Sequence, residues 1–395
     1  MNIASFAFRS YPAKGGVELH QKLISDYFSK KGNTVTVYTS RMGDISEYLT
    51  INLRFPFFHF PKKQSQLKYA ETIDNIKFKR FDIRFRFYSY NQMNNLYATF
   101  EKEVTNYDIV HLHGLNVYNN YRLAKIAHKH NVPVILSCYD ISIPDNLPFL
   151  TKMFKNVYDS LFIKRMGKYV CEFLLLTKDQ IPELEKIGIS KQKISVWSAG
   201  FDIAKHKIRY NDKSILKKYG VLGKRYIFNI GRIEEYKGVQ DIVRIAKNHP
   251  TLNFLIGGKD DGYVTVLHKL AADLHVRNVT FLGELSEQDA TVLLRNAYLF
   301  VFPSKKEGWG IVLAEAMSVG VPCVAYNIPN VRTVFTNGKS GFLVKHINDM
   351  DDAVMRLYKN KKLYTQMSKH AIIEAQQYDY HNNLPLLEKI YKKYV

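Results

Sequence analysis

The chain has 395 residues, which is long enough for two domains of ordinary size. Hydrophobic residues make up 46% and charged residues 24%, a balance that is typical of a globular protein and excludes a disordered one. The formal net charge of +21 points to an anionic partner. Because no recognised nucleic-acid-binding module is present, we do not expect that partner to be a nucleic acid.

Residues 1–8 predict a first strand with no basic region before it, so we do not interpret them as a signal peptide. Cys138, Cys171 and Cys323 lie far apart in apolar surroundings without metal-binding spacing, and we expect reduced core residues. No apolar run reaches the roughly 18 residues of a membrane-spanning helix. Together these features predict a cytoplasmic protein.

The first half of the chain alternates strands with helices, which predicts a parallel, doubly wound sheet of the α/β class. The predicted strands are residues 3–8, 34–38, 109–112, 134–137, 173–177 and 194–197, and the predicted helices are 17–31, 91–104, 121–130 and a stretch within 178–187. Residues 44–90 look irregular, with short strands around 77–81.

A basic amphipathic helix is expected within residues 147–169, which carry five basic residues and one acid around aromatic and aliphatic side chains at helical spacing. Lys152, Lys155, Lys164, Arg165 and Lys168 are its cations. Such a helix can lie on an anionic membrane surface. The alternative is that its apolar face packs on the sheet, as in most amphipathic helices.

The alternation restarts after residues 198–202, which we interpret as an inter-domain hinge. Predicted strands follow at 226–230, 253–256, 279–282, 299–302 and 323–325, with helices between them and at 349–377 and 380–395. We therefore predict an N-terminal Rossmann-like domain over 1–198, a C-terminal one over 199–378, and a last helix over 379–395. Open α/β sheets bind ligands beyond the carboxyl ends of their strands.

Glu307 and Glu315 are the most informative pair of residues. The segment from Ser304 to Met317 places Glu307 in a loop after a strand and Glu315 one turn into the next helix. The free amides at that helix start favour an anion. Carboxylates accept hydrogen bonds from sugar and ribose hydroxyls, so the pattern suits a nucleotide-sugar; two unrelated solvent-facing acids are the alternative.

Two cations, Arg232 and Lys237, follow the first strand of the second half. Breaking the bond between a sugar and a diphosphate gathers negative charge on the leaving group, which two cations can stabilise as a divalent metal does elsewhere. Arg suits bidentate phosphate contacts and Lys acts as a point charge. The alternative is a solvated loop in which Glu234 and Glu235 pair with the cations.

The first half offers weaker candidates. Gly15 and Gly16, between the first strand and helix, allow the backbone to approach a donor pyrophosphate, although a simple tight turn is the alternative. His111 and His113 end a strand on one face of the sheet, where His113 could contact an acceptor or donor sugar or be a structural histidine.

Four motifs in order resemble the retaining glycosyltransferases of family 4, whose two Rossmann-like domains face a cleft in the GT-B fold. They begin at Lys14, at Asp108, at Gly231 and at Glu307, and the last one ends at Pro322. The resemblance implies that Glu307 binds the donor sugar near the reacting carbon, that Glu315 holds the ribose, and that Gly310, Ile311 and Val312 give amides to the distal phosphate. It also implies that the last helix crosses back onto the first domain.

The chain departs from the family pattern in two places. Tyr139, followed by Asp140, stands where members often carry a histidine near the donor sugar, although either residue could hydrogen-bond a sugar. The usual glycine-rich loop with a glutamate is replaced by residues 326–331. Asp349 and Asp351 have the D-x-D form of metal-dependent glycosyltransferases of another fold, but here they predict a helix start.

We therefore predict a retaining, metal-independent enzyme without cofactors that moves a sugar from a UDP- or GDP-sugar to a glycan or lipid-linked acceptor. Its acceptor would be bound by the first domain, at the inner face of a membrane. Two alternatives remain open: a non-transferring GT-B relative, such as a nucleotide-sugar epimerase or a phosphorylase, and a non-enzymatic basic membrane-binding protein.

Overall fold

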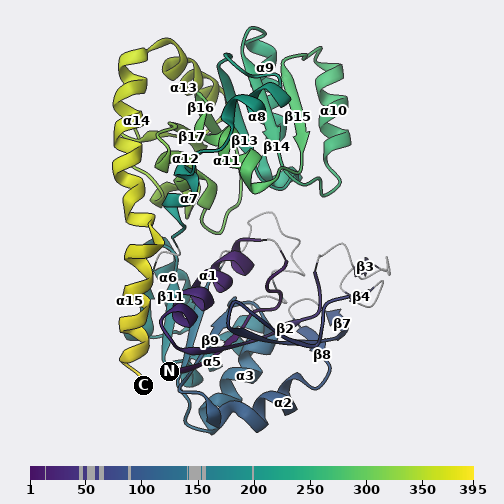
Figure 1. Cartoon of the computed structure of the whole chain (residues 1–395), viewed down its shortest axis with the longest axis vertical. Helices are drawn as coiled ribbons and strands as arrows, with labels where there is room; N and C mark the ends of the chain where they lie inside the picture. Colours follow the sequence, from purple (N-terminus) through teal and green to yellow (C-terminus); the bar gives the residue numbers. More distant parts are fainter. Residues whose placement is uncertain are drawn as a thin grey trace. The chain divides into compact units, whose positions relative to one another are not determined.

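The computed structural model describes residues 1–13, 15–43, 48–50, 58–61, 66–87, 90–139, 141, 153, 157–197 and 200–395 (Figure 1). The chain forms two compact units. The first comprises Met1–Ala199 together with Leu384–Val395, and the second comprises Gly200–Asn383. Each unit is an α/β structure built on its own sheet.

The first unit contains an eight-stranded sheet that is parallel except at one edge. In spatial order its strands are β12 (Ile194–Val196), β11 (Glu172–Leu175), β10 (Val134–Cys138), β9 (Ile109–His113), β1 (Asn2–Phe6), β2 (Thr34–Ser40), β6 (Ile76–Phe81) and β5 (Ala70–Ile73). The strand order reverses between β9 and β1, which pair with Ile3 opposite Ile109. Ligands of such sheets bind beyond the carboxyl ends of the strands at this reversal.

Helices cover this sheet and bury its apolar residues. They are α1 (Gly16–Lys30), α2 (Leu96–Glu103), α3 (Tyr118–Lys129), α5 (Lys164–Tyr169) and α6 (Ile181–Ile187), with a π-helical turn at Asp159–Ile163 before α5. The C-terminal helix α15 (Tyr380–Lys392) ends on the same unit. There Tyr391 stacks on Phe28 with ring centroids 4.6 Å apart.

Between residues 44 and 90, the described residues are more regular than the sequence predicts. A second, antiparallel sheet joins β3 (Tyr48–Thr50), β4 (Phe58–Pro61), β7 (Ile83–Phe87) and β8 (Tyr90–Met93). The alternation of apolar and basic residues in β7 has the period of a strand. Strand β8 also takes up the start of the helix predicted at 91–104, so that prediction was wrong for its first residues. The two-residue turn Asp74–Asn75, with φ of 51° and 63°, joins β5 to β6.

The second unit is built on a six-stranded, fully parallel sheet. In spatial order its strands are β15 (Val279–Gly283), β14 (Asn253–Gly257), β13 (Tyr226–Ile230), β16 (Leu299–Phe302), β17 (Cys323–Tyr326) and β18 (Gly341–Val344). Its helices are α7 (Ile203–Lys207), α8 (Asp212–Lys218), α9 (Val239–Asn248), α10 (Val264–Asp273), α11 (Glu287–Arg295), α12 (Ile311–Ser318), α13 (Ile347–Lys359) and α14 (Lys361–Ala375). The strand order reverses between β13 and β16, which are neighbours.

Two sequence expectations concern the whole chain. Cys138 and Cys323 are buried free thiols, while Cys171 is free and only partly buried. In the part of the chain that the structure describes, no helix has both the length and the apolar character needed to cross a membrane.

Candidate functional site

The reversal of strand order in the second unit brings two loops together that are far apart in sequence. One follows β13 and carries Arg232 and Lys237, and the other follows β16 and carries Glu307. The loops are tied by the amide of Lys305, which donates to the carbonyl of Tyr236 over 2.8 Å. Parallel strands end at the same edge of a sheet, so the two cations and the carboxylate share one site.

Lys237 and Glu307 form an ion pair at the centre of this edge. The Nζ of Lys237 lies 2.5 Å from Oε1 of Glu307, and the side chains are only 19% and 12% exposed. Gly238 permits this approach: its φ is 72°, and a Cβ there would lie 2.0 Å from the carbonyl oxygen of Pro303. The lysine therefore neutralises the acid in a largely water-excluded place.

Arg232 lies on the same loop but is half-exposed. Its guanidinium pairs with Glu234, lies 3.3 Å from Asp261, and donates to the hydroxyl of Tyr236 over 3.0 Å. Burial raises the pKa of Tyr236 to about 12, so this phenol is neutral near pH 7. Of the two acids that the sequence offered as alternative partners, Glu234 pairs with Arg232, while Lys237 pairs with Glu307.

Helix α12 opens beside the Glu307 loop without a capping side chain. Gly310 is its N-cap with φ 81°, and the helix begins at Ile311, so the amides of Ile311 and Val312 lie in the first turn. First-turn amides have no partner inside a helix and carry partial positive charge. Asn330 donates to the carbonyl of Glu307 over 3.0 Å and fixes the loop before the helix.

Glu315 lies one turn further along α12 and is 19% exposed. His206, on α7, is the group beside it: Nε2 of the ring lies 3.6 Å from Oε1 of Glu315. The site therefore contains two carboxylates with different partners, a lysine at Glu307 and a histidine at Glu315. Sequence reasoning did not point to His206.

Uncharged rings gather at the corresponding edge of the first unit. Nδ1 of His20 and Nδ1 of His113 each lie 2.7 Å from the hydroxyl of Tyr139, and His20 stacks on Trp197 at 4.9 Å. Behind them, Nδ1 of His111 lies 2.6 Å from the hydroxyl of Tyr391 and Nε2 lies 2.8 Å from Ser137. These contacts connect α1, β9, the end of β10 and α15.

Burial keeps these imidazoles neutral. It lowers the pKa of His20 to about 3, and burial together with the neighbouring His20 lowers the pKa of His111 to about 3. Burial lowers the pKa of His113 well below its usual value as well. The hydroxyl of Tyr139 has one proton and two ring nitrogens beside it. It therefore donates to one Nδ1 and accepts from the other. The two Nε2 atoms, on His20 and His113, are buried and have no partner among the described residues.

The start of α1 already holds an anion. Glu18 is buried in the first turn, its carboxylate lies against Gly15, and Oε1 is 2.5 Å from the guanidinium of Arg9. Gly15 is the N-cap and Gly16 the first residue of the helix. The negative charge of this carboxylate interacts with the positive end of the helix dipole. The helix start therefore attracts an incoming phosphate less strongly.

Two family models match almost the whole chain. The one described as Glycosyltransferase Family 4 covers residues 14–205, and the one described as Glycosyl transferases group 1 covers 211–373. The chain belongs to the family 4 glycosyltransferases. Its two parallel-sheet units are the GT-B fold, as in the crystal structure of Anabaena Alr3699/HepE in complex with UDP, which covers 100% of both chains with a TM-score of 0.78 at 17% identity.

Curated relatives agree with this family. The N-acetyl-alpha-D-glucosaminyl L-malate synthase of Bacillus anthracis is 30% identical over 39% of this chain and 42% of its own length. The N,N'-diacetylbacillosaminyl-diphospho-undecaprenol alpha-1,3-N-acetylgalactosaminyltransferase of Campylobacter jejuni is 28% identical over 58% of this chain and 62% of its own length. The matched region is thus less than two thirds of either relative.

Within this family 4 chain, the residues singled out from sequence fall into two groups. Arg232, Lys237, Glu307, Glu315 and the α12 start lie in the second unit, and Gly15, Gly16, His113 and Tyr139 in the first. Asp140 lies outside the described residues. His20, Trp197, His206 and Asn330 were missed; only contacts between remote elements single them out.

The acids at 349 and 351 lie in the first turns of helix α13, which begins two residues before the start that the sequence predicts. Asp349 accepts from the amide of His346 over 3.1 Å in a capping box of α13, and Asp351 bonds Asn248 over 2.8 Å and also His249. Across the described ranges, no group of three His, Cys, Asp or Glu side chains has the arrangement to hold a metal ion.

Proposed function

We propose that the chain transfers a sugar, with retention of anomeric configuration and without a metal, from a nucleotide-diphosphate sugar to a glycan or lipid-linked acceptor. The observation that carries this proposal is the Lys237–Glu307 ion pair beside the uncapped start of α12. The cation and the helix amides suit a diphosphate, and the carboxylate suits the hydroxyl groups of a sugar.

Donor binding would rearrange the ion pair. The diphosphate takes Lys237 and the amides of Ile311 and Val312 as partners, which releases the Glu307 carboxylate to accept from a sugar hydroxyl. As the bond to the sugar breaks, charge gathers on the diphosphate, and Lys237 and Arg232 stabilise it. The acceptor hydroxyl attacks from the side that the diphosphate leaves, and a phosphate oxygen takes its proton.

Glu315 would hold the nucleotide ribose through its hydroxyls, with His206 fixing the carboxylate. In the first unit, the neutral cluster of His20, His113 and Tyr139 would bind sugar hydroxyls. Nε2 of His20 and Nε2 of His113, which have no partner among the described residues, support this role, because one must be a donor and the other an acceptor, a combination that a hydroxyl group satisfies. The Gly15–Gly16 turn stays a weaker proposal for a donor contact, since Glu18 occupies it.

Similar proteins and one surface of the first unit support the proposed acceptor and location. The Campylobacter jejuni relative is named for transfer onto a diphospho-undecaprenol compound, and Alr3699/HepE was crystallised with UDP. Met153, Val157 and Leu161, at helical spacing, are 43%, 49% and 40% exposed, and Lys164, Arg165 and Lys168 follow them. This face would bind the cytoplasmic side of an anionic membrane.

A panel of nucleotide-sugars tests the central proposal. One UDP- or GDP-sugar should be slowly hydrolysed and should raise the melting temperature, because a ligand at 100 times its Kd stabilises a protein by about 2.7 kcal/mol. Isomerisation of the sugar without an acceptor would instead indicate an epimerase. Binding to anionic vesicles with no nucleotide-sugar effect at all would indicate the non-enzymatic alternative.

A further inference from the structure

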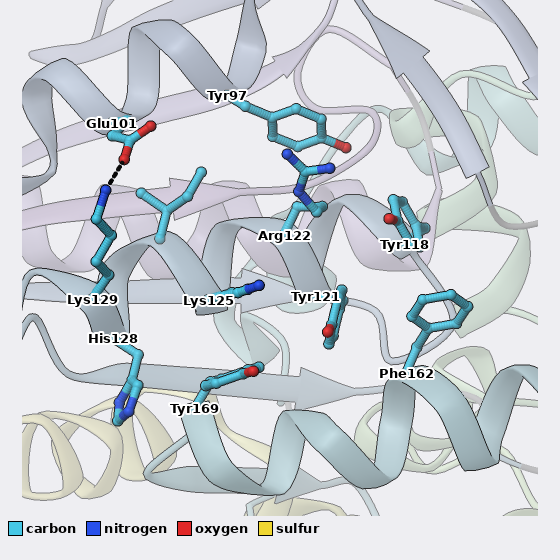
Figure 2. Close-up of a pocket in the computed structure, with 11 residues that line it drawn as sticks. Tyr97, Glu101, Tyr118, Tyr121, Arg122, Lys125, His128, Lys129, Phe162 and Tyr169 are labelled. Atoms are coloured by element: carbon cyan, nitrogen blue, oxygen red, sulfur yellow. Dashed lines mark hydrogen bonds and ion pairs between the residues drawn. The ribbon is translucent and has the colours of Figure 1, made fainter.

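The first unit has a groove on its outer helical surface that the proposed chemistry does not use. It has a volume of about 690 Å³ and is lined by α2, α3, the π-helical turn and α5 (Figure 2). Helix α3 presents one face to the core through Leu123, Ala124 and Ala127. Its other face, with residues at i, i+4, i+7 and i+11, lines the groove: Tyr118, Arg122, Lys125 and Lys129.

An unbroken row of aromatic rings forms one part of the lining. Tyr118 meets Phe162 at 5.0 Å between centroids, Phe162 meets Tyr121 at 5.2 Å, and Tyr121 meets Tyr169 at 5.9 Å. His128 continues the row at 5.4 Å from Tyr169. Flat rings whose edges contact one another are held in place, and aromatic faces pack well on the apolar faces of sugar rings.

Cations form the other part. The guanidinium of Arg122 lies over the ring of Tyr97 at 4.8 Å, and Lys125 is exposed with no acidic partner among the described residues. Lys129 pairs with Glu101 over 2.8 Å, but both side chains are well exposed, so this pair is weak and easily exchanged. Among the described residues that line the groove, Glu101 is the only acid, and the charge of this lining is therefore positive.

We propose that this groove binds an anionic glycan, that is, a chain of sugar rings carrying carboxylate or phosphate groups, along α3. The inference rests on the proposed function in one respect: the glycan would be the distal part of the acceptor. Helix α3 begins five residues after His113 at the carboxyl edge of β9 and is about 18 Å long, enough for several sugar residues.

A membrane surface fits this groove less well than a glycan. Side chains that enter a bilayer project from the protein, as Val157 and Leu161 do at 49% and 40% exposure. The tyrosine and phenylalanine rings of the row do not: Tyr121 is 9% exposed, and Tyr118, Phe162 and Tyr169 are partly buried, while His128 at the end of the row is exposed. A recessed row of rings is reached by a narrow chain and not by a flat surface.

Binding of defined probes tests the proposal without any donor. The probes are a hyaluronan octasaccharide, neutral maltooctaose and phosphatidylglycerol vesicles, titrated against the wild-type chain, the R122E/K125E variant and a K186E/K191E control. Lys186 and Lys191 are exposed residues of the same unit outside the groove, so the control has the same change in net charge. A second variant, Y118L, keeps the charge but removes a flat ring.

We expect the octasaccharide to bind the wild type and the control equally, and more tightly than maltooctaose. Affinity should fall about tenfold or more in R122E/K125E and severalfold in Y118L, and should weaken as salt is raised. The proposal is overturned if no octasaccharide binding is seen, if R122E/K125E binds like the control, or if the variant loses only vesicle binding. A chain that binds the octasaccharide but turns over no nucleotide-sugar would refute the proposed enzyme and keep the groove.

Discussion

The loops at the strand reversal of the second unit carry full charges in pairs, whereas the corresponding edge of the first unit carries neutral rings. Lys237 and Glu307 lie 2.5 Å apart, while Tyr139 lies between two imidazoles whose pKa values are lowered by burial. Both edges arise from the same topology. The difference teaches that the same topology can carry paired charges at one edge and uncharged rings at the other.

The largest loss of activity is expected when Lys237, at the charged edge of the second unit, is replaced. Lys237→Met should lower kcat/KM for sugar transfer by about 10² to 10³-fold, the range seen when one transition-state donor is removed. Arg232→Ala should cost about 10²-fold, because Arg232 is half-exposed and shares three partners. Steady-state kinetics at varied donor concentration provide the measurement.

Lys305→Met is the matched control for that comparison. Lys305 lies on the neighbouring loop but is 55% exposed and 3.7 Å from Asp241, so activity should change little. Thermal melting must accompany the kinetics, because removing Lys237 leaves Glu307 without its partner. Retained activity in both the Lys237 and Arg232 variants would show that the leaving group is held elsewhere.

The two carboxylates of the charged edge should separate kinetically. Glu307→Gln should lower kcat by roughly 10²-fold, because its contacts lie nearest the charge that develops on the sugar. Glu315→Gln should raise the donor KM about tenfold with kcat nearly unchanged, since ribose contacts are alike in the ground and transition states. The opposite pattern would refute the role of each acid.

The sequence predicts the framework better than it predicts the contacts. Alternating periods indicated both parallel sheets, and the position of Arg232, Lys237 and Glu307 after strands indicated one edge. Lys237 and Glu307 are 70 residues apart and pair because β13 lies beside β16. The sequence does not reveal which strands are neighbours, so it could not predict this pair. The meeting of His20, His113 and Tyr139 depends on packing between α1, β9 and β10 in the same way.

The elements that were missed have physical reasons too. Strands β7 and β8 pair in a small antiparallel sheet, and polar residues lower the apolar character of both: two arginines in β7, and an asparagine and a glutamine in β8. Strand β18 is a four-residue edge strand that begins with a glycine, too short for a periodic pattern.

The buried histidines of the first unit should make the free energy of unfolding fall in acid. Burial lowers the pKa of His20 and His111 to about 3, below the value near 6.5 of an unfolded chain. The unfolded chain therefore binds more protons between these values, so stability is full above pH 6.5 and falls as the pH falls toward 3. Each such histidine adds a slope of at most about 1.4 kcal/mol per pH unit.

Urea unfolding at pH 7, 6 and 5 measures this slope. His20→Gln should reduce the loss of stability between pH 7 and 5 compared with the wild type, because one titrating group is gone. His370→Gln, at an exposed helical position of the second unit, should leave the slope unchanged. Equal slopes in the wild type and the His20 variant would show that the ring has the same pKa in the folded and unfolded chain, against this prediction.

The smallest effect is expected from removing metal ions. If Lys237, Arg232 and the α12 amides provide the charge that stabilises the departing diphosphate, a divalent cation has no remaining task there. Transfer measured after exhaustive chelation should then stay within about twofold of the untreated rate. A complete loss that Mg²⁺ or Mn²⁺ restores would contradict this.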